Sequence, residues 1–332
     1  SMEQSNLLLK KWRVRIFGTL WLSYALMYFG RVNMAIALPF IEQEFGWSTV
    51  TLGLISGSFF WVYAFGQLVN GTLGDHLSPR WFVFVGLVGT AIMNFAFGAS
   101  QTVLAMVLFW GLNGVFQSMG WGPILATGAN WARPAERNKV SAFLGTTFVL
   151  GSLLSWYLSG QILSRFTRWE LVFWIPSVVL AIQAALWVTL IRDHPSQVGL
   201  SLDEHSPTLP EQKPPLKAYI RDTLVFLRQP QFLFLALVTI IQGMIKDGIN
   251  LWTPSLLVQS QNQSIGIAAI YSLLIPFFGF LGVLIATWFN QRLKGNDELT
   301  ITLLFLVGVG VAVSYSCQFF YKCENCHTIL KP

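Results

Sequence analysis

Charged residues are scarce in this chain. Asp, Glu, Lys and Arg make up 11% of its 332 residues, against about 25% in an ordinary soluble domain. Hydrophobic residues make up 54%, including 14 Trp and 27 Phe. This composition predicts an all-α polytopic membrane protein. The net charge of +6 is scattered through short loops, so it does not indicate a nucleic-acid partner.

Cysteine is rare as well. Three cysteines, all near the C-terminal end, are too few for a disulfide framework. Cys323, Cys326 and His327 spell the C-x-x-C-H pattern of haem attachment, but no domain follows that would enclose a haem. We expect a chance match, with adventitious metal binding and haem as the lesser alternatives.

Sets of catalytic residues are also missing. The histidines fall in loops or in the tail, and we find no paired carboxylates, phosphate-cradling Gly loop or Ser/His/Asp set. The sequence therefore predicts a protein that is not an enzyme and uses no cofactor.

Long apolar runs dominate what is present. Each run below is long enough to cross a bilayer as a helix. Nine spans are predicted, at residues 16–40, 51–73, 81–99, 102–131, 140–163, 170–191, 232–258, 265–289 and 299–320.

The basic residues predict the orientation of these spans. If the N-terminus is cytoplasmic, most of the 21 Lys and Arg residues fall in cytoplasmic loops, and only Arg165, Arg168, Lys322 and Lys331 lie outside. Cytoplasmic loops carry the excess of Lys and Arg in membrane proteins, so we expect a cytoplasmic N-terminus.

A polar segment rich in Pro and Ser divides the chain. We expect an N-terminal six-helix bundle over 1–192, a cytoplasmic linker over 193–230 with a short surface helix near 216–228, and a partial C-terminal bundle of three helices over 231–332. The two halves also echo each other, because spans two and eight both end in a Gly followed by a basic turn. Such weak internal repeats are typical of secondary transporters, whose site lies where the halves meet.

Two cations lie inside the predicted spans, one in each half. Arg31 is in the first span and Lys246 in the seventh, whereas Asp247 is the only acid inside a span away from its ends. A charge at bilayer depth costs a few kcal/mol at least, so it usually has a partner or a function. Asp247 is adjacent to Lys246, but neighbouring helix positions point in different directions. We therefore predict a central anion site formed by Arg31 and Lys246, with structural pairing as the alternative.

Four stretches together resemble a known family. Gly71–Arg80 follows the loop signature of the major facilitator superfamily. The stretches around Arg31, at Phe116–Pro123 and at Lys246–Pro254 are similar to the organophosphate:phosphate antiporters, which include glycerol-3-phosphate and hexose-phosphate transporters. The resemblance covers about residues 12–310 and implies the major facilitator fold, of whose twelve helices this sequence supplies nine.

The resemblance also implies roles for single residues. Arg31 and Lys246 match the basic residues that hold the phosphoryl group, and Tyr24, Tyr28 and Tyr63 match tyrosines of the same cavity. The sequence departs from the glycerol-phosphate carriers at four matching positions: Phe148 replaces a His, Gln67 and Val32 each replace a Lys, and Lys246 replaces an Arg. The substrate of this protein and its coupling to protonation can therefore differ from those of the glycerol-phosphate carriers.

Further candidates follow from position. Gln117 and Trp121 are four residues apart, so they share one face of the predicted helix. We give equal weight to two roles for them, substrate contact and core packing. We predict gating roles for the helix-end and loop residues Gly71, Asp75, Arg80 and Arg137. In this hypothesis Asp75 pairs with Arg137, and Gly71 with Gly74 permits close helix packing.

We predict a monomeric secondary active transporter that exchanges an organophosphate for inorganic phosphate by alternating access. Its partners would be the small anionic substrate, inorganic phosphate and the lipid bilayer. A bacterial cytoplasmic membrane is the expected location, or the endoplasmic reticulum if the chain is eukaryotic. Two alternatives stay open: another organic-anion symporter of the same superfamily, and a non-transporting receptor for sugar phosphates.

Overall fold

The computed structural model describes residues 2–202, 221, 225, 228–261, 263–293, 299–304, 306–308 and 310. By contacts the chain forms two compact units, Ser1–Pro276 and Phe277–Pro332, each described here by itself. The linker expected over 193–230, its surface helix and the C-x-x-C-H tail lie largely or wholly outside the described residues. The predicted division into two bundles stays a prediction.

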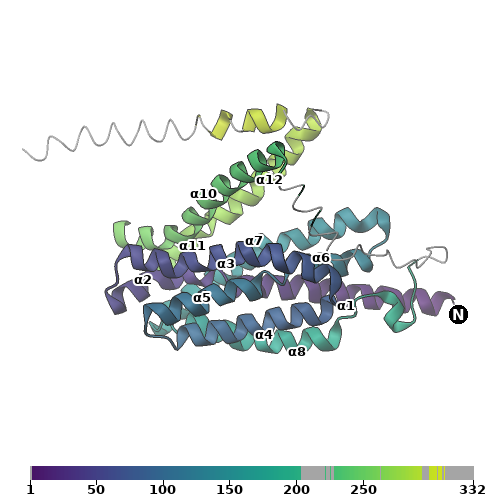
Figure 1. Cartoon of the computed structure of the whole chain (residues 1–332), viewed down its shortest axis with the longest axis horizontal. Helices are drawn as coiled ribbons and strands as arrows, with labels where there is room; N and C mark the ends of the chain where they lie inside the picture. The colour runs from purple at the N-terminus through teal and green to yellow at the C-terminus, as the bar shows by residue number, and fades with distance from the viewer. Residues whose placement is uncertain are drawn as a thin grey trace, which may run out of the picture. The chain divides into compact units, whose positions relative to one another are not determined.

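Helices account for nearly all of the first unit (Figure 1). In chain order they are α1 (Met2–Phe29), α2 (Asn33–Phe45), α3 (Thr49–His76), α4 (Pro79–Gly98), α5 (Val103–Gln117), α6 (Trp121–Asn130), α7 (Arg137–Phe166), α8 (Leu171–Leu190), α10 (Pro230–Gln261) and α11 (Ile265–Ser272). Two short 3₁₀ turns, η1 (Pro134–Glu136) and η2 (Pro195–Val198), join them, and α12 (Leu274–Arg292) leads into the second unit.

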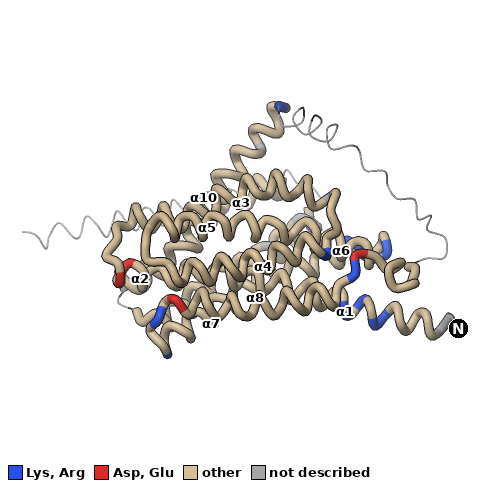
Figure 2. Tube along the Cα trace, turned by 60° about the horizontal axis from the view of Figure 1, so that its bottom comes forward, with Lys and Arg blue, Asp and Glu red and all other residues tan. Residues whose placement is uncertain are grey.

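Among the described residues, eight helical stretches are long and apolar enough to cross a membrane. They agree with the first eight predicted spans, although the first extends over Gln4–Phe45. Of the ninth span, the described part is the shorter apolar helix Leu299–Gly308. Figure 2 shows most coloured residues of α1–α8 toward the two ends of this group of helices, as expected for a part of the chain that crosses a membrane.

Local sequence signals set several helix ends. Ser48 Oγ accepts a hydrogen bond from the Thr51 amide before α3, and Thr102 Oγ1 accepts one from Ala105 before α5. Pro79 occupies the first turn of α4, where no amide hydrogen is needed. Gly46 ends α2 with φ of 63°, a left-handed conformation that glycine adopts without strain.

Two of the predicted spans are broken near their middle. The first divides into α1 and α2 at Gly30–Val32, so Arg31 lies in a turn and not inside a helix. The fourth divides into α5 and α6 at Ser118–Gly120. Gly120 lies so close to Met27 that an added Cβ would be 2.7 Å from the Met27 Sδ. The two breaks therefore lie against each other.

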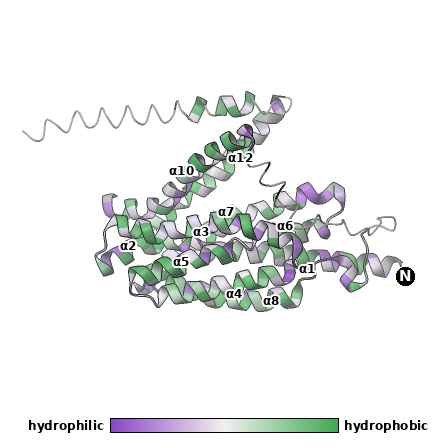
Figure 3. Ribbon diagram, viewed as in Figure 1, coloured by the Kyte–Doolittle hydropathy of each residue, from purple (hydrophilic) through white to green (hydrophobic). Residues whose placement is uncertain are grey.

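Two apolar clusters lie on either side of these breaks. One contains Phe97, Trp110 and Phe173, and the other contains Ile16, Leu20 and Trp187. Val32 packs against both clusters. Large hydrophobic side chains are also exposed on α4, α5 and α8, among them Ile92, Leu108 and Ile182, and Figure 3 colours much of these helices as hydrophobic. Lipid would cover these exposed side chains in a membrane.

Helices α10 and α11 complete the first unit. α10 packs along α2, and the Gln259 amide donates a hydrogen bond to the Glu42 carboxylate. α11 packs on α7, where an added Cβ at Gly160 would lie 2.6 Å from Ala269 Cβ. Small residues thus bring α7 and α11 close together, as is common between membrane helices.

Candidate functional site

The break at Gly30–Val32 is held by side chains from other helices. Asn94 Nδ2 and Asn113 Nδ2 donate to the Gly30 carbonyl at 3.0 and 2.9 Å. Trp156 Nε1 donates to the Val32 carbonyl at 3.0 Å. Backbone groups freed from a helix inside a bilayer need such substitutes, because lipid offers no hydrogen bonds. Side chains of α4, α5 and α7 therefore supply hydrogen bonds to the carbonyl groups of the break.

Two further amides extend this network. Asn33 Nδ2 donates to Asn94 Oδ1 at 3.1 Å and to the Val172 carbonyl at 2.9 Å. Gln117 Nε2 donates to the Met27 carbonyl at 2.9 Å. Asn33, Asn94 and Asn113 are each 0% exposed. The turn that carries Arg31 is thus fixed from several sides.

Arg31 projects among aromatic rings. Its Cζ lies 4.4 Å from the centre of the Tyr63 ring, 5.4 Å from that of Phe59 and 5.5 Å from that of Tyr28. Within the described part of the chain, no carboxylate lies within ion-pair distance of its guanidinium. Ring faces attract a cation through their quadrupole but carry no net charge. Arg31 therefore keeps its positive charge and its capacity to donate to an anion.

Tyr63 has a second polar neighbour. Gln67 Nε2 donates a hydrogen bond of 2.6 Å to the Tyr63 hydroxyl oxygen. A phenol hydroxyl can accept and donate at once, so its own proton stays available for another acceptor. Tyr63 and Arg31 together offer donors of the kind that phosphate oxygens bind.

Lys246 lies in a different setting. It is inside the continuous helix α10, and its side chain is 46% exposed. Its Nζ is 3.4 Å from Asp247 Oδ1, so the expectation of a lone cation is wrong at this position. The flexible lysine side chain reaches the neighbouring residue despite the different directions in which the two Cβ atoms point.

A short series of aromatic contacts connects the two cations. Lys246 Nζ is 5.5 Å from the Phe148 ring centre, which is 5.7 Å from that of Tyr28. Tyr28 in turn contacts Arg31. Two rings thus separate the cations, and Phe148 occupies the place between them.

The remaining predicted contacts line the same region. The Tyr24 ring packs edge-on against the Tyr28 ring, with centroids 5.4 Å apart, and at a tilt against the Trp121 ring, with centroids 4.9 Å apart. Tyr24 and Tyr28 are each 6% exposed and Gln117 is 3% exposed. The structure therefore brings Arg31, Tyr24, Tyr28, Tyr63, Trp121 and Lys246 into one neighbourhood, whereas Gln117 uses its amide on the backbone.

The sequence interpretation missed the residues that hold the break. Asn33, Asn94 and Asn113 are polar side chains inside apolar spans, which is a signal that was available. Phe59 was missed because a phenylalanine in such a span is indistinguishable from an ordinary packing residue.

The predicted gating residues are dispersed. An added Cβ at Gly71 meets no described atom within 4 Å, so the close packing expected there is wrong, while at Gly74 it would lie 3.2 Å from Pro123 Cγ. Arg80 donates to the Val188 carbonyl, and Arg137 is exposed at the start of α7. The Asp75 side chain, and with it the Asp75–Arg137 pair, lies outside the described residues.

An acid that sequence analysis overlooked lies beside Arg80. Asp193 accepts hydrogen bonds from Ser78 Oγ at 2.5 Å and from the Arg80 amide at 2.8 Å. Asn130 Nδ2 donates to the Asp193 carbonyl at 3.1 Å. A carboxylate at a helix N-terminus is favourable, and Asp193 thereby joins α4, α6 and the end of α8.

The apolar helices, two of them broken near their middle, define this protein as a polytopic helical membrane protein. The family model described as Major Facilitator Superfamily matches residues 20–320. The chain belongs to the major facilitator superfamily.

Several characterised relatives are similar over most of the chain. A probable hexose phosphate transport protein of Chlamydia trachomatis is 26% identical over 319 residues, covering 92% of this chain and 70% of that protein. The glycerol-3-phosphate transporter of Bacillus subtilis is 27% identical, with coverage of 92% and 70%. The membrane sensor protein UhpC of Escherichia coli is 26% identical, with coverage of 91% and 70%.

Solved structures support the fold. A bacterial homolog of the human lysosomal transporter Spinster matches with a TM-score of 0.70 at 16% identity, covering 85% of this chain and 63% of that one. The chain thus spans less than two thirds of that structure. The likeness confirms the predicted all-α fold of the major facilitator type.

Proposed function

We propose that this protein exchanges an organophosphate for inorganic phosphate by alternating access. The observation that carries the proposal is Arg31, which has no carboxylate partner among the described residues and is fixed at a helix break. A guanidinium offers a planar fork that suits two phosphate oxygens. The relatives named as hexose-phosphate and glycerol-3-phosphate transporters support the substrate class.

In the proposed mechanism Arg31 holds the phosphoryl group and Tyr63 donates a further hydrogen bond. Lys246 closes on the same group from α10, exchanging the Asp247 carboxylate for a phosphate oxygen. Two uncompensated cations at low dielectric repel each other, so a bound anion lowers the cost of bringing them together. A ligand shifts the conformational equilibrium only by its differential affinity for the two states. The empty carrier therefore reorients slowly, and one anion enters as another leaves.

Vesicle exchange tests this proposal. Protein reconstituted into vesicles loaded with labelled inorganic phosphate should release label when a hexose phosphate or glycerol 3-phosphate is added outside. Arg31→Gln should abolish the release. Arg168→Gln is the matched control, because Arg168 is 58% exposed and pairs with Glu170 at 3.5 Å, away from the site. No release by the unaltered protein would refute exchange.

A receptor is the second candidate. The sensor protein UhpC is as similar in sequence to this chain as the named transporters are. A receptor would bind the phosphorylated sugar, with loss of binding in Arg31→Gln, and would release no label. An organic-anion symporter would instead need an ion gradient and would ignore phosphate.

A further inference from the structure

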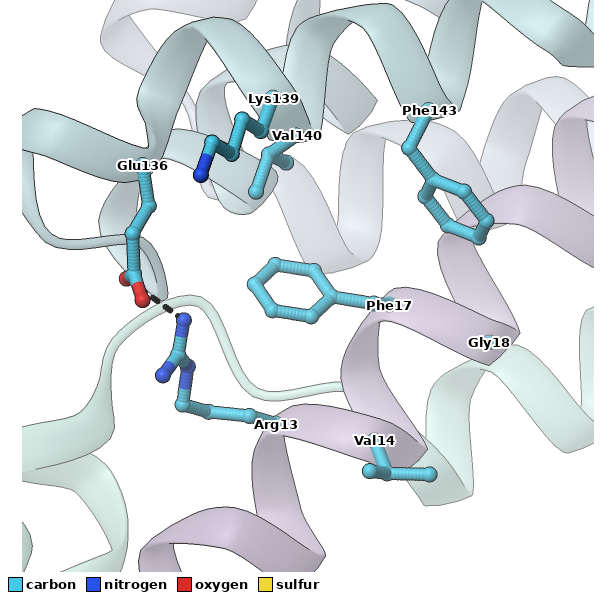
Figure 4. Close-up of a pocket in the computed structure, with 8 residues that line it drawn as sticks. All are labelled: Arg13, Val14, Phe17, Gly18, Glu136, Lys139, Val140 and Phe143. Carbon is cyan, nitrogen blue, oxygen red and sulfur yellow. Dashed lines mark hydrogen bonds and ion pairs between the residues drawn. The ribbon is translucent and has the colours of Figure 1, made fainter.

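A second concave site lies between α1 and α7, away from the Arg31 region. Its volume is about 510 Å³, and Figure 4 shows the eight residues that line it. They are Arg13, Val14, Phe17, Gly18, Glu136, Lys139, Val140 and Phe143. None of these residues contributes to the site around Arg31.

The lining changes from charged to apolar along both helices. Arg13 on α1 and Glu136 and Lys139 at the start of α7 form one end, and Figure 4 shows all three on the same side of Phe17. Phe17 and Phe143 follow one turn further along their helices. The change occurs over the same stretch of both walls, so the cavity itself is amphipathic.

The charged end carries a net positive charge. Arg13 Nη2 donates to Glu136 Oε2 at 2.7 Å, and the Arg133 amide donates to the same oxygen at 2.9 Å. Lys139 has no carboxylate within ion-pair distance in the part of the chain that the structure describes. After Glu136 neutralises Arg13, the Lys139 ammonium is left to attract an anion.

The apolar end is uncovered by described residues. Val14 is 68% exposed and Phe143 is 45% exposed. A small soluble anion bound at Lys139 would leave these surfaces in contact with water. A lipid would cover them with an acyl chain while its headgroup meets the basic end, where basic residues near an anionic leaflet are favourable.

We infer that this cavity binds an anionic phospholipid of the leaflet that faces the basic ends of α1 and α7. The Lys139 ammonium holds the phosphodiester, while Arg13 stays paired with Glu136, and an acyl chain lies over Phe17, Val140 and Phe143. Charge complementarity at one end and exposed apolar surface at the other select this occupant. The alternative occupant is another segment of the protein itself.

Native mass spectrometry of the purified protein in detergent tests the inference, with phosphatidylglycerol as probe and phosphatidylcholine as the zwitterionic comparison. The first phosphatidylglycerol should bind more tightly than phosphatidylcholine. Lys139→Gln should weaken it about five-fold, the effect of one basic residue at an anionic membrane surface. Arg165→Gln, an exposed cation in the last turn of the same helix, is the matched control and should leave binding unchanged.

Filling the cavity gives a test that leaves the charges in place. An added Cβ at Gly18 meets no atom within 4 Å, so Gly18→Leu should occupy the space and abolish selective lipid binding. Val14→Trp fills the same space from an exposed position and serves if Gly18→Leu folds poorly by circular dichroism.

Several results would overturn the inference. These are equal binding of both lipids, retained binding in both filled variants, or equal loss in Arg165→Gln. Displacement of the lipid by free glycerol phosphate in the Arg31→Gln background would instead assign the cavity to a soluble anion. If neither lipid binds, the inference is wrong, and another segment of the protein covers the apolar end of the cavity.

Discussion

The surroundings of Arg31 and of Lys246 differ in almost every physical respect. Arg31 lies in a turn whose carbonyls accept bonds from buried asparagines, and three rings surround its guanidinium. Lys246 lies in an unbroken helix, is half exposed and has its own counter-ion. One cation is positioned before any ligand arrives, and the other must exchange a partner to take part.

This difference assigns unequal parts to two residues of the same charge. A preorganised donor loses little freedom on binding, so its contribution to affinity is large. A lysine that leaves a carboxylate for a ligand phosphate contributes only the difference in free energy between these two ion pairs. The comparison therefore predicts a graded set of mutational effects.

The largest effect is expected at Arg31. Arg31→Gln should raise the Kd for inorganic phosphate by more than 100-fold, because losing one partner of a buried charge pair costs about 3 kcal/mol. Phosphate-dependent thermal shift measures this, and the variant's far-ultraviolet circular dichroism checks its folding. An unchanged phosphate-induced shift in Arg31→Gln would exclude Arg31 from the site.

The next effect is expected at the break itself. Asn94→Ala removes one of the two donors to the Gly30 carbonyl and the acceptor of one Asn33 bond, and each lost hydrogen bond costs about 1 kcal/mol. We expect a lower melting temperature and about 10-fold weaker ligand binding, since about 1.4 kcal/mol corresponds to ten-fold.

Ser177→Ala is the control for this variant, because Ser177 Oγ donates to the Ala91 carbonyl on the same helix α4 but not to the break. If Asn94→Ala and Ser177→Ala lose stability equally and both keep full affinity, the break does not position Arg31.

A smaller and opposite pair of effects is expected on α10. Lys246→Gln should weaken binding, and Lys246→Arg should retain more of it. Asp247→Asn should strengthen binding about two- to five-fold, because it frees Lys246 from a partly exposed ion pair worth up to about 1 kcal/mol. Titration calorimetry with phosphate measures all three. Weaker binding in Asp247→Asn would show that the carboxylate supports the site and does not compete with the ligand.

The smallest effect is expected at Gln67. Gln67→Leu removes the amide that donates to Tyr63. Since one neutral hydrogen bond contributes about 1 kcal/mol, affinity should fall about five-fold or less. Tyr63→Phe should give a similar loss, and the double variant should lose no more than the larger single effect. Additive losses of affinity would show that Gln67 and Tyr63 act independently.

Much of this arrangement follows from the sequence, and some of it does not. Apolar run lengths gave the first eight spans because the bilayer fixes helix length. The charge at Arg31 pointed to the candidate site, because an ion at that depth usually has a partner or a function, and its role there stays a prediction. The breaks were not foreseen, because neither Gly30 nor Gly120 is distinguishable from other glycines in the same spans.

The partner of Lys246 shows a second limit. Helical spacing predicts the direction of a Cβ atom but not the reach of a four-carbon side chain. Asp193 shows a third, since its bonds to Ser78 and Arg80 join residues more than 100 positions apart. Such contacts depend on how helices pack, which local patterns do not determine.

The double acceptor at Gly30 has a consequence for altering what the protein carries. Any substitution that shifts Arg31 must also release bonds from α4 and α5, so the half that we propose to hold phosphate resists adaptation. Engineering a new preference is therefore best begun on α10, where side chains near Lys246 can be randomised while Arg31, the proposed anchor for the phosphoryl group, stays in place.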